Sequence, residues 1–293
     1  MLGTRVLTAA VALIILIGAA FVAPPFAFDV LLLAIVSAAC FEWLKLLDLS
    51  SQKSGLIAAA LFGLSVSAFY SVPAIAQLSI GLGSAMVWLY AVAAMFWVVG
   101  VPFALSTRRA LGGKRLAGQV LAIFLCLVTG FALLHADGLG KGFLLSVLLL
   151  VWVADTAAYF SGRALGKRKL APQISPGKTW EGVVGALLAN TAMAIVLASM
   201  NWVSQANPAG TVFSWMASSL GYPLMIAFTI LLTLVSVAGD LYESLLKRIA
   251  GVKDSGNLLP GHGGVFDRID ALLAVFPVTM FLVALMQSGQ LGR

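Results

Sequence analysis

The chain has 293 residues, of which 61% are hydrophobic and only 10% are charged, with a net charge of +7 and a mean hydropathy of +1.04. Soluble globular proteins carry about 25% charged residues, so this composition excludes a soluble enzyme and indicates a polytopic membrane protein. The two cysteines, Cys40 and Cys126, lie in apolar runs. They predict neither a disulfide framework nor a zinc site.

Apolar runs long enough to cross a bilayer recur along the whole chain. A hydrocarbon core of roughly 30 Å needs about 20 apolar residues per helix. The first run follows Arg5 as a signal peptide would, but its apolar core is too long and more membrane helices follow. We expect an all-α protein consisting of one integral membrane domain, residues 1–293. About nine transmembrane helices are predicted, at residues 6–23, 27–47, 55–72, 82–104, 117–135, 142–160, 182–200, 221–246 and 271–288.

The lysines and arginines predict the orientation of these helices, because cytoplasmic loops carry an excess of positive charge. With the N-terminus inside and the C-terminus outside, all but two of the 18 basic residues fall in cytoplasmic segments. The two exceptions are Lys141 and Arg293. The basic face is explained by topology and anionic lipid, or by a polyanionic ligand. Charge alone does not separate these readings.

Four acids from three segments are predicted at a similar depth near the cytoplasmic face. Asp155 lies about five residues, or ~7.5 Å, from the cytoplasmic end of its helix, and Asp240 lies ~10 Å deep in the eighth helix. Asp267 and Asp270 flank the start of the ninth. Carboxylates inside apolar helices are costly and usually functional. A cluster of short acids beside bases suits a hard cation such as Mg²⁺, which takes carboxylate and phosphate oxygens together.

Each acid also has a structural interpretation. One polar stripe of the eighth helix contains Asp240, Glu243, Ser244 and Lys247. Its charges would pair along the helix and extend to the membrane interface, although the Asp240 side chain is too short to reach the interface from its depth. The acids at 267 and 270 would favour a helix N-terminus. The common depth of the acids favours the functional interpretation.

Two polar loops carry further candidates. In the segment KDSGNLLPGHGGVFDRID (253–270), Gly261, Gly263 and Gly264 would let the backbone approach a phosphate. His262 between them is a general base, a phosphate donor or a plain turn residue, and the sequence does not decide.

The second loop contains ISPGKTWEG (174–182), which resembles a nucleotide-binding loop. It lacks the required glycine, because residue 172 is proline. Ser175, Lys178 and Thr179 precede a membrane helix, whose N-terminus would bind an anion. Alternatively, Ser or Thr merely caps that helix near Glu181.

Residues 244–270, SLLKRIAGVKDSGNLLPGHGGVFDRID, resemble the signature of the phosphatidate cytidylyltransferases (CDP-diacylglycerol synthases). Residues 155–182 and Phe41-Glu42-Trp43 are also similar to that family. Gly177 departs from the pattern, since lysine is common there. The signature positions matched are Ser244, Lys247, Arg248, Lys253, Asp254, Gly256, Leu259, Pro260, His262, Gly263, Gly264, Asp267, Arg268 and Asp270.

The resemblance implies a Mg²⁺-dependent enzyme of phospholipid biosynthesis, with room for a second cation, that converts CTP and phosphatidate to CDP-diacylglycerol and pyrophosphate. It implies a homodimer in the bacterial inner membrane, with its site facing the cytoplasm and no nucleic-acid partner. The expected metal ligands are Asp240, Asp267 and Asp270, with Asp155 as a further candidate. Catalysis is assigned to these first three together with Ser244 and Lys247. Substrate binding is assigned to Ser175, Lys178, Arg248, Lys253, His262, Gly263, Gly264 and Arg268.

Under this interpretation, helices 1–5 (residues 1–135) are scaffold and lipid access, and helices 6–9 (residues 141–293) carry the catalytic motifs. Two other functions compete. A CDP-alcohol phosphotransferase also binds metal through acids, but its longer acidic motif is missing from this sequence. A cation-coupled transporter would place its acids near the midplane rather than near one face.

Overall fold

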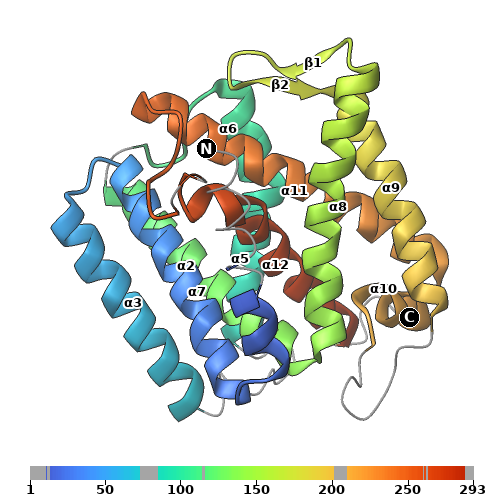
Figure 1. Ribbon diagram of the computed structural model, residues 1–293, viewed down its shortest axis with the longest axis horizontal. Helices are drawn as coiled ribbons and strands as arrows, with labels where there is room; N and C mark the ends of the chain where they lie inside the picture. Colours follow the sequence, from blue (N-terminus) through green and yellow to red (C-terminus); the bar gives the residue numbers. More distant parts are fainter. Residues whose placement is uncertain are drawn as a thin grey trace.

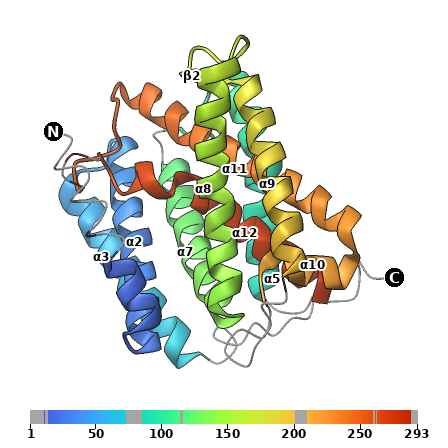
Figure 2. The same cartoon turned by 45° about the vertical axis from the view of Figure 1, so that its right-hand side comes forward.

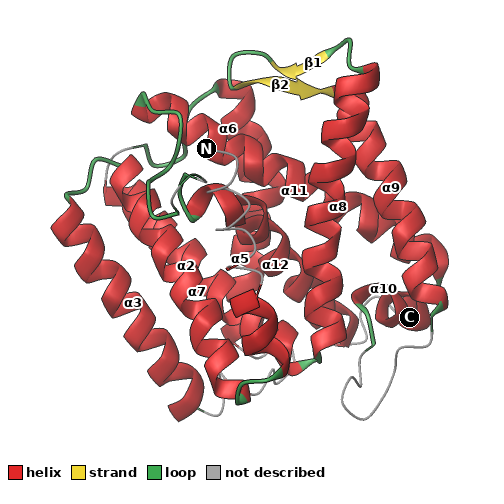
Figure 3. Ribbon diagram, viewed as in Figure 1, coloured by secondary structure: helices red, strands yellow, loops and turns green. Residues whose placement is uncertain are grey.

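The computed structural model describes residues 11, 14–72, 85–113, 116–200, 210–259, 261 and 263–287. This part of the chain is helical apart from one short hairpin and connecting loops (Figures 1 and 3). Eight of its helical segments are long and apolar enough to span a membrane, and they coincide in order with the last eight predicted runs. The first run, 6–23, lies largely outside the described residues, so the count of nine stays a prediction.

The spanning segments have the following bounds. They are α2 (Pro25–Leu46), α3 (Ser51–Ser71), the continuous stretch of α5 (Ala85–Met95), η1 (Phe96–Gly100) and α6 (Val101–Thr107), then α7 (Leu116–Gly138), α8 (Lys141–Leu165), α9 (Trp180–Ser199), α11 (Tyr222–Ala250) and α12 (Phe266–Gln287). The sequence did not predict the short α10 (Val212–Leu220). With nine residues it is too short to cross a bilayer, and a Thr211–Ser214 capping box starts it.

The last helix, α12, forms the centre of the bundle (Figures 1 and 2). Its apolar window is 89% buried, against 22% to 56% for the other spans. A helix that is apolar on all sides is stable only when neighbours surround it, and α12 packs against α5, α7 and α11. Because α12 begins at Phe266, Asp267 and Asp270 lie in the first two turns of this central helix.

A two-stranded antiparallel hairpin connects α8 to α9. Strands β1 (Lys169–Ala171) and β2 (Ser175–Thr179) pair through Lys169 with Thr179 and Ala171 with Ser175. Thr179 Oγ1 then accepts a hydrogen bond from Gly182 N at 3.1 Å and so caps α9. Thr179 therefore caps α9, as one alternative for this loop predicted, and anion binding at this N-terminus stays a prediction. Lys178, which directly precedes the capping residue, lies in β2 and is positioned by the hairpin.

Candidate active site

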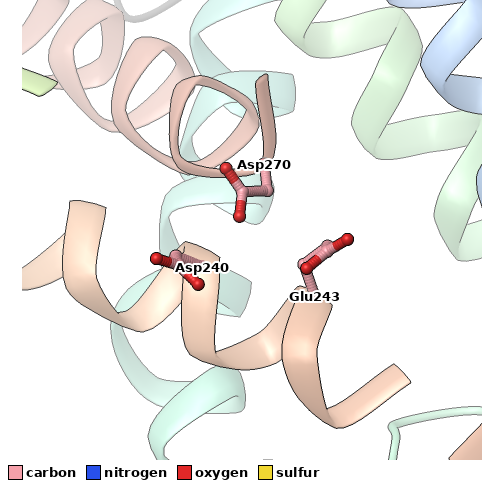
Figure 4. Close-up of side chains that lie close together, drawn as sticks. All are labelled: Asp240, Glu243 and Asp270. Atoms are coloured by element: carbon pink, nitrogen blue, oxygen red, sulfur yellow. The ribbon is translucent and has the colours of Figure 1, made fainter. Parts of the chain in front are cut away.

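Three carboxylates converge where α11 packs against the start of α12. Asp240 and Glu243, one turn apart on α11, and Asp270 of α12 offer ligand oxygens that lie within 4.8 Å of one another (Figure 4). Gly239 permits this approach, since a methyl group there would lie 3.0 Å from Ala274 Cβ and 3.1 Å from the Asp270 carbonyl oxygen. This group of three acids is called the acid triad below.

Lys247 joins the acid triad to Asp267. Its Nζ lies 2.6 Å from Glu243 Oε2 and 2.6 Å from Asp267 Oδ1. The side chains of Lys247, Glu243 and Asp267 are 14%, 2% and 9% exposed, so these ion pairs are sheltered from water. Pairing along the α11 stripe is therefore present. Glu243 Oε1 is nevertheless buried and has no hydrogen-bond partner among the described residues, so one oxygen of this acid remains available to a ligand.

Asp267 is held by the connection between α11 and α12 as well as by Lys247. Its Oδ2 accepts hydrogen bonds from Ser255 N at 2.9 Å and from Gly264 N at 2.8 Å, and it lies 3.0 Å from Ser255 Oγ. Gly263, at φ +80°, pairs with Leu259 and closes the turn. The N–H of Gly264 thus binds Asp267 in this structure. His262 and Pro260 lie outside the described residues.

Asp240 also contacts the hairpin. Lys178 Nζ lies 2.7 Å from Asp240 Oδ2, with the two side chains 24% and 31% exposed. Ser244 Oγ lies 3.5 Å from Asp240 Oδ1, at the limit of a hydrogen bond. A lysine from β2 therefore neutralises the most accessible acid of the triad.

Two cavities meet at this ion pair, and both are lined by Asp155 and Asp240. The first, of about 520 Å³, is mainly polar and also contains Lys247 and Arg268. The second, of about 380 Å³, contains Lys178 and lies against α8, the hairpin and α9. The remaining lining of the first is Val151, Trp152, Glu243, Asp254, Asp267 and Asp270. That of the second is Ala158, Tyr159, Gly162, Arg163, Leu170, Ser175, Gly177, Thr179, Gly182, Val183 and Val237.

Two of the basic residues expected to bind substrate line neither cavity. Arg248 instead donates from Nε to the Ile174 carbonyl at 3.1 Å and braces the hairpin turn. Lys253 is exposed in the α11–α12 connection. Their assignment to substrate binding stays a prediction, as do the metal assignments of Asp267 and Asp155, which line the first cavity without belonging to the acid triad.

Sequence reasoning gave too little weight to three polar residues. The sequence placed Glu243 only in the polar stripe of the eighth helix, did not single out Ser255, and marked Glu42 only within a family resemblance. Glu42 is 1% exposed and hydrogen-bonded to the α11–α12 connection. The available signal was a carboxylate within an apolar helix, which is usually functional.

Comparison with known proteins places this geometry in context. The sequence model of the cytidylyltransferase family matches residues 3–286 of this chain. The chain is 39% identical over 282 residues to a phosphatidate cytidylyltransferase of Pseudomonas aeruginosa, with 95% of each chain covered. It is 47% identical over 141 residues to that of Haemophilus influenzae, covering 47% of this chain and 44% of the relative. It is also 41% identical over 152 residues to that of Bacillus subtilis, covering 52% and 51%.

Proposed function

Because this chain belongs to the cytidylyltransferase family and is therefore a nucleotidyltransferase, we propose that it makes CDP-diacylglycerol and pyrophosphate from CTP and phosphatidate. The observation that carries the proposal is the acid triad, which shares a cavity with Lys247 and Arg268 at one end of a membrane helix bundle. One substrate is a lipid and the other a polyanion, and such a position offers access to both.

The acid triad fits a divalent cation. Its donors are carboxylate oxygens, which Mg²⁺ prefers, and Glu243 Oε1, which has no hydrogen-bond partner within the described part of the chain, is available for coordination. We propose that Asp240, Glu243 and Asp270 hold Mg²⁺, which would neutralise phosphate charge when bound. Asp267 lines the same cavity and remains a candidate ligand, either for this ion or for a second cation, if Lys247 moves away from it.

The reaction is a single in-line displacement. A phosphate oxygen of phosphatidate attacks the α-phosphorus of CTP, and a new P–O bond forms. The bond from the α-phosphorus to the bridging oxygen breaks, and pyrophosphate leaves with that electron pair. Such transfers depend on positioning and charge neutralisation. Lys247, Arg268 and Lys178 would supply positive charge around the phosphates, and Ser244 would orient one of them.

The charge distribution supports a cytoplasmic site. Lys178, Lys247 and Arg268 belong to segments that the positive-inside rule assigns to the cytoplasm. We therefore propose an inner-membrane protein whose two cavities open to the cytoplasm, where CTP is available. A homodimer, with α2 to α7 serving as scaffold and lipid access, remains part of the proposal.

The test uses purified protein, phosphatidate, Mg²⁺ and CTP labelled at the α-phosphorus. The proposal expects label in the lipid phase and one pyrophosphate released per labelled lipid. A CDP-alcohol phosphotransferase would instead consume CDP-diacylglycerol and an alcohol, and a transporter would move ions in sealed vesicles without lipid labelling. Absence of lipid labelling in protein that binds CTP would overturn the assignment.

A further inference from the structure

Glu42, far from the acid triad in sequence, is buried beneath the loop that precedes α12. It lies on α2 and is 1% exposed. Its Oε2 accepts a hydrogen bond from Phe266 N at 2.8 Å and lies 3.1 Å from Ser255 Oγ. Its Oε1 is buried without a hydrogen-bond partner among the described residues. Burying a carboxylate this deeply is costly, and lipid contact or core packing does not require one.

The contacts of Glu42 continue to the acid triad through an unbroken series of polar groups. Ser255 Oγ lies between Glu42 Oε2 and Asp267 Oδ2, at 3.1 Å and 3.0 Å. Asp267 Oδ1 binds Lys247, and Lys247 binds Glu243. Asp267, Lys247 and Glu243 line the first cavity, so Glu42 is connected to the site through Ser255. This series of five side chains is called the polar relay below.

Aromatic packing fixes the same point of the chain. Trp43, the next residue of α2, stacks on Phe266 with ring centroids 4.9 Å apart and planes inclined by 14°. The backbone of Phe266 is bound by Glu42 and its ring by Trp43. Since Phe266 is the first residue of α12, α2 contacts both the backbone and the ring at the point where that helix begins. One turn later, α12 carries Asp270, its member of the acid triad.

Glu42 lies so close to two glycines of the α11–α12 connection that neither position has room for a larger residue. A methyl group on Gly256 would overlap Glu42, whose Oε1, Cδ and Cγ are the three nearest atoms. A methyl group on Gly264 would overlap Ser255 Oγ and Glu42 Oε2. Gly256 does not have a positive φ, so alanine there is opposed by contact with Glu42 rather than by backbone strain.

We propose that Glu42 is a positioning residue for the cytidylyl transfer: through Ser255 and Phe266 it locks the α11–α12 connection so that Asp267 and Asp270 face α11. This inference rests on the proposed function and assigns α2, otherwise scaffold, a defined part in the site. Glu42 lines neither of the two cavities, and it acts through Asp267, Lys247 and the start of α12.

The first experiment compares Glu42→Ala with Leu33→Ala on the same helix. Leu33 is buried against Gly130 of α7, nine residues or ~13.5 Å along α2 from Glu42, so its truncation opens a core cavity away from the α11–α12 connection. Glu42→Ala should lower kcat/KM by about 100-fold, as misplacement by about 1 Å does elsewhere. Glu42→Gln, which keeps an acceptor, should recover all but about fivefold. Leu33→Ala should lower thermal stability with kinetics close to wild type.

Hydrogen exchange gives a readout that does not depend on activity. In the wild type, carboxylates bind the amides of Ser255, Gly264 and Phe266. Glu42→Ala should accelerate exchange across residues 254–267 and leave α9 unchanged, whereas Leu33→Ala should leave 254–267 protected. Unchanged exchange and kinetics in Glu42→Ala would overturn the inference. A wild-type protein without transfer activity would instead overturn the proposed function, with the exchange result still interpretable.

A double-mutant cycle tests the contact itself. Gly256→Ala should cost about 30-fold in kcat/KM in the wild type, but less than about threefold once Glu42→Ala has removed the overlapping side chain. Equal losses in both backgrounds would show that Gly256 is needed for another reason, and the direct link between α2 and the connection would fall.

Discussion

Lys178 Nζ lies 2.7 Å from Asp240 Oδ2, and this ion pair joins the hairpin to the acid triad. The same pair stands where the two cavities meet, because Asp240 lines both and Lys178 lines the second. The lysine is thus placed to exchange its carboxylate partner for a phosphate when substrate enters.

The first prediction concerns this lysine. Lys178→Met should lower kcat/KM by about 100-fold, because it removes a cation beside developing phosphate charge. Lys178→Arg should be milder, about tenfold, since the charge is kept in a larger group. The matched control is Lys169→Met on β1, an exposed lysine of the same hairpin that lines neither cavity. Steady-state kinetics in CTP and phosphatidate will check the series, and equal losses at 169 and 178 would contradict it.

The second prediction separates the acids by their dependence on metal. Asp240→Asn, Glu243→Gln and Asp270→Asn should each lower activity at least about 100-fold, since each removes charge from a cation site. All three should also raise the Mg²⁺ concentration needed for half-maximal rate. Asp267→Asn should lower kcat with little change in that concentration if the residue acts by holding Lys247.

The outcome at Asp267 is decisive for its assignment. A metal requirement raised as much as in Asp270→Asn would make Asp267 a ligand, as the sequence predicted. Chelation followed by Mg²⁺ addition should abolish and restore the wild-type reaction, which calibrates the measurement. Near-normal turnover in Glu243→Gln would remove that residue from the triad and return it to pairing with Lys247.

The helices were predictable from sequence because each is specified locally. A run of about 20 apolar residues has few alternatives in a bilayer, and the eight described spans follow that rule. The hairpin was missed for the opposite reason. Its strands have three and five residues, and β2 contains Pro176 and Gly177, so no alternating pattern marks them.

The polar stripe of the site was predictable from the sequence, but the pairing of its acids across helices was not. Helix periodicity placed Asp240 and Glu243 on one face, yet their grouping with Asp270 depends on the close crossing of α11 and α12 at Gly239. The hydrogen bonds that Asp267 accepts from Ser255 and Gly264 depend on how the α11–α12 connection folds. Both are tertiary facts, which residue spacing within one helix does not contain.

The third prediction concerns topology. A reporter fused to the N-terminus should be cytoplasmic, and one fused after Arg293 should be external, because all but two basic residues fall on one face in that arrangement. The control is a reporter inserted between α8 and α9 near Lys167, which should be cytoplasmic with the site. Both termini on one side would require an even number of spans and remove the first predicted helix.

The fourth prediction is that no covalent cytidylyl-enzyme forms. A serine nucleophile needs an adjacent base that a third group orients. Ser244 Oγ lies 3.5 Å from Asp240 Oδ1, but the other oxygen of that carboxylate is bound by Lys178, so this acid is held in an ion pair rather than oriented as the base of a serine nucleophile. The phosphatidate oxygen is already anionic and needs only placement.

Isotope exchange distinguishes the two mechanisms. Without lipid, labelled pyrophosphate should not enter CTP, because no cytidylyl group has been transferred to an acceptor. Ser244→Ala should reduce the complete reaction only partially, by about tenfold, since it removes one hydrogen bond near a phosphate. Robust exchange in rigorously lipid-free protein, lost in Ser244→Ala, would make Ser244 the nucleophile and replace single displacement by a two-step transfer.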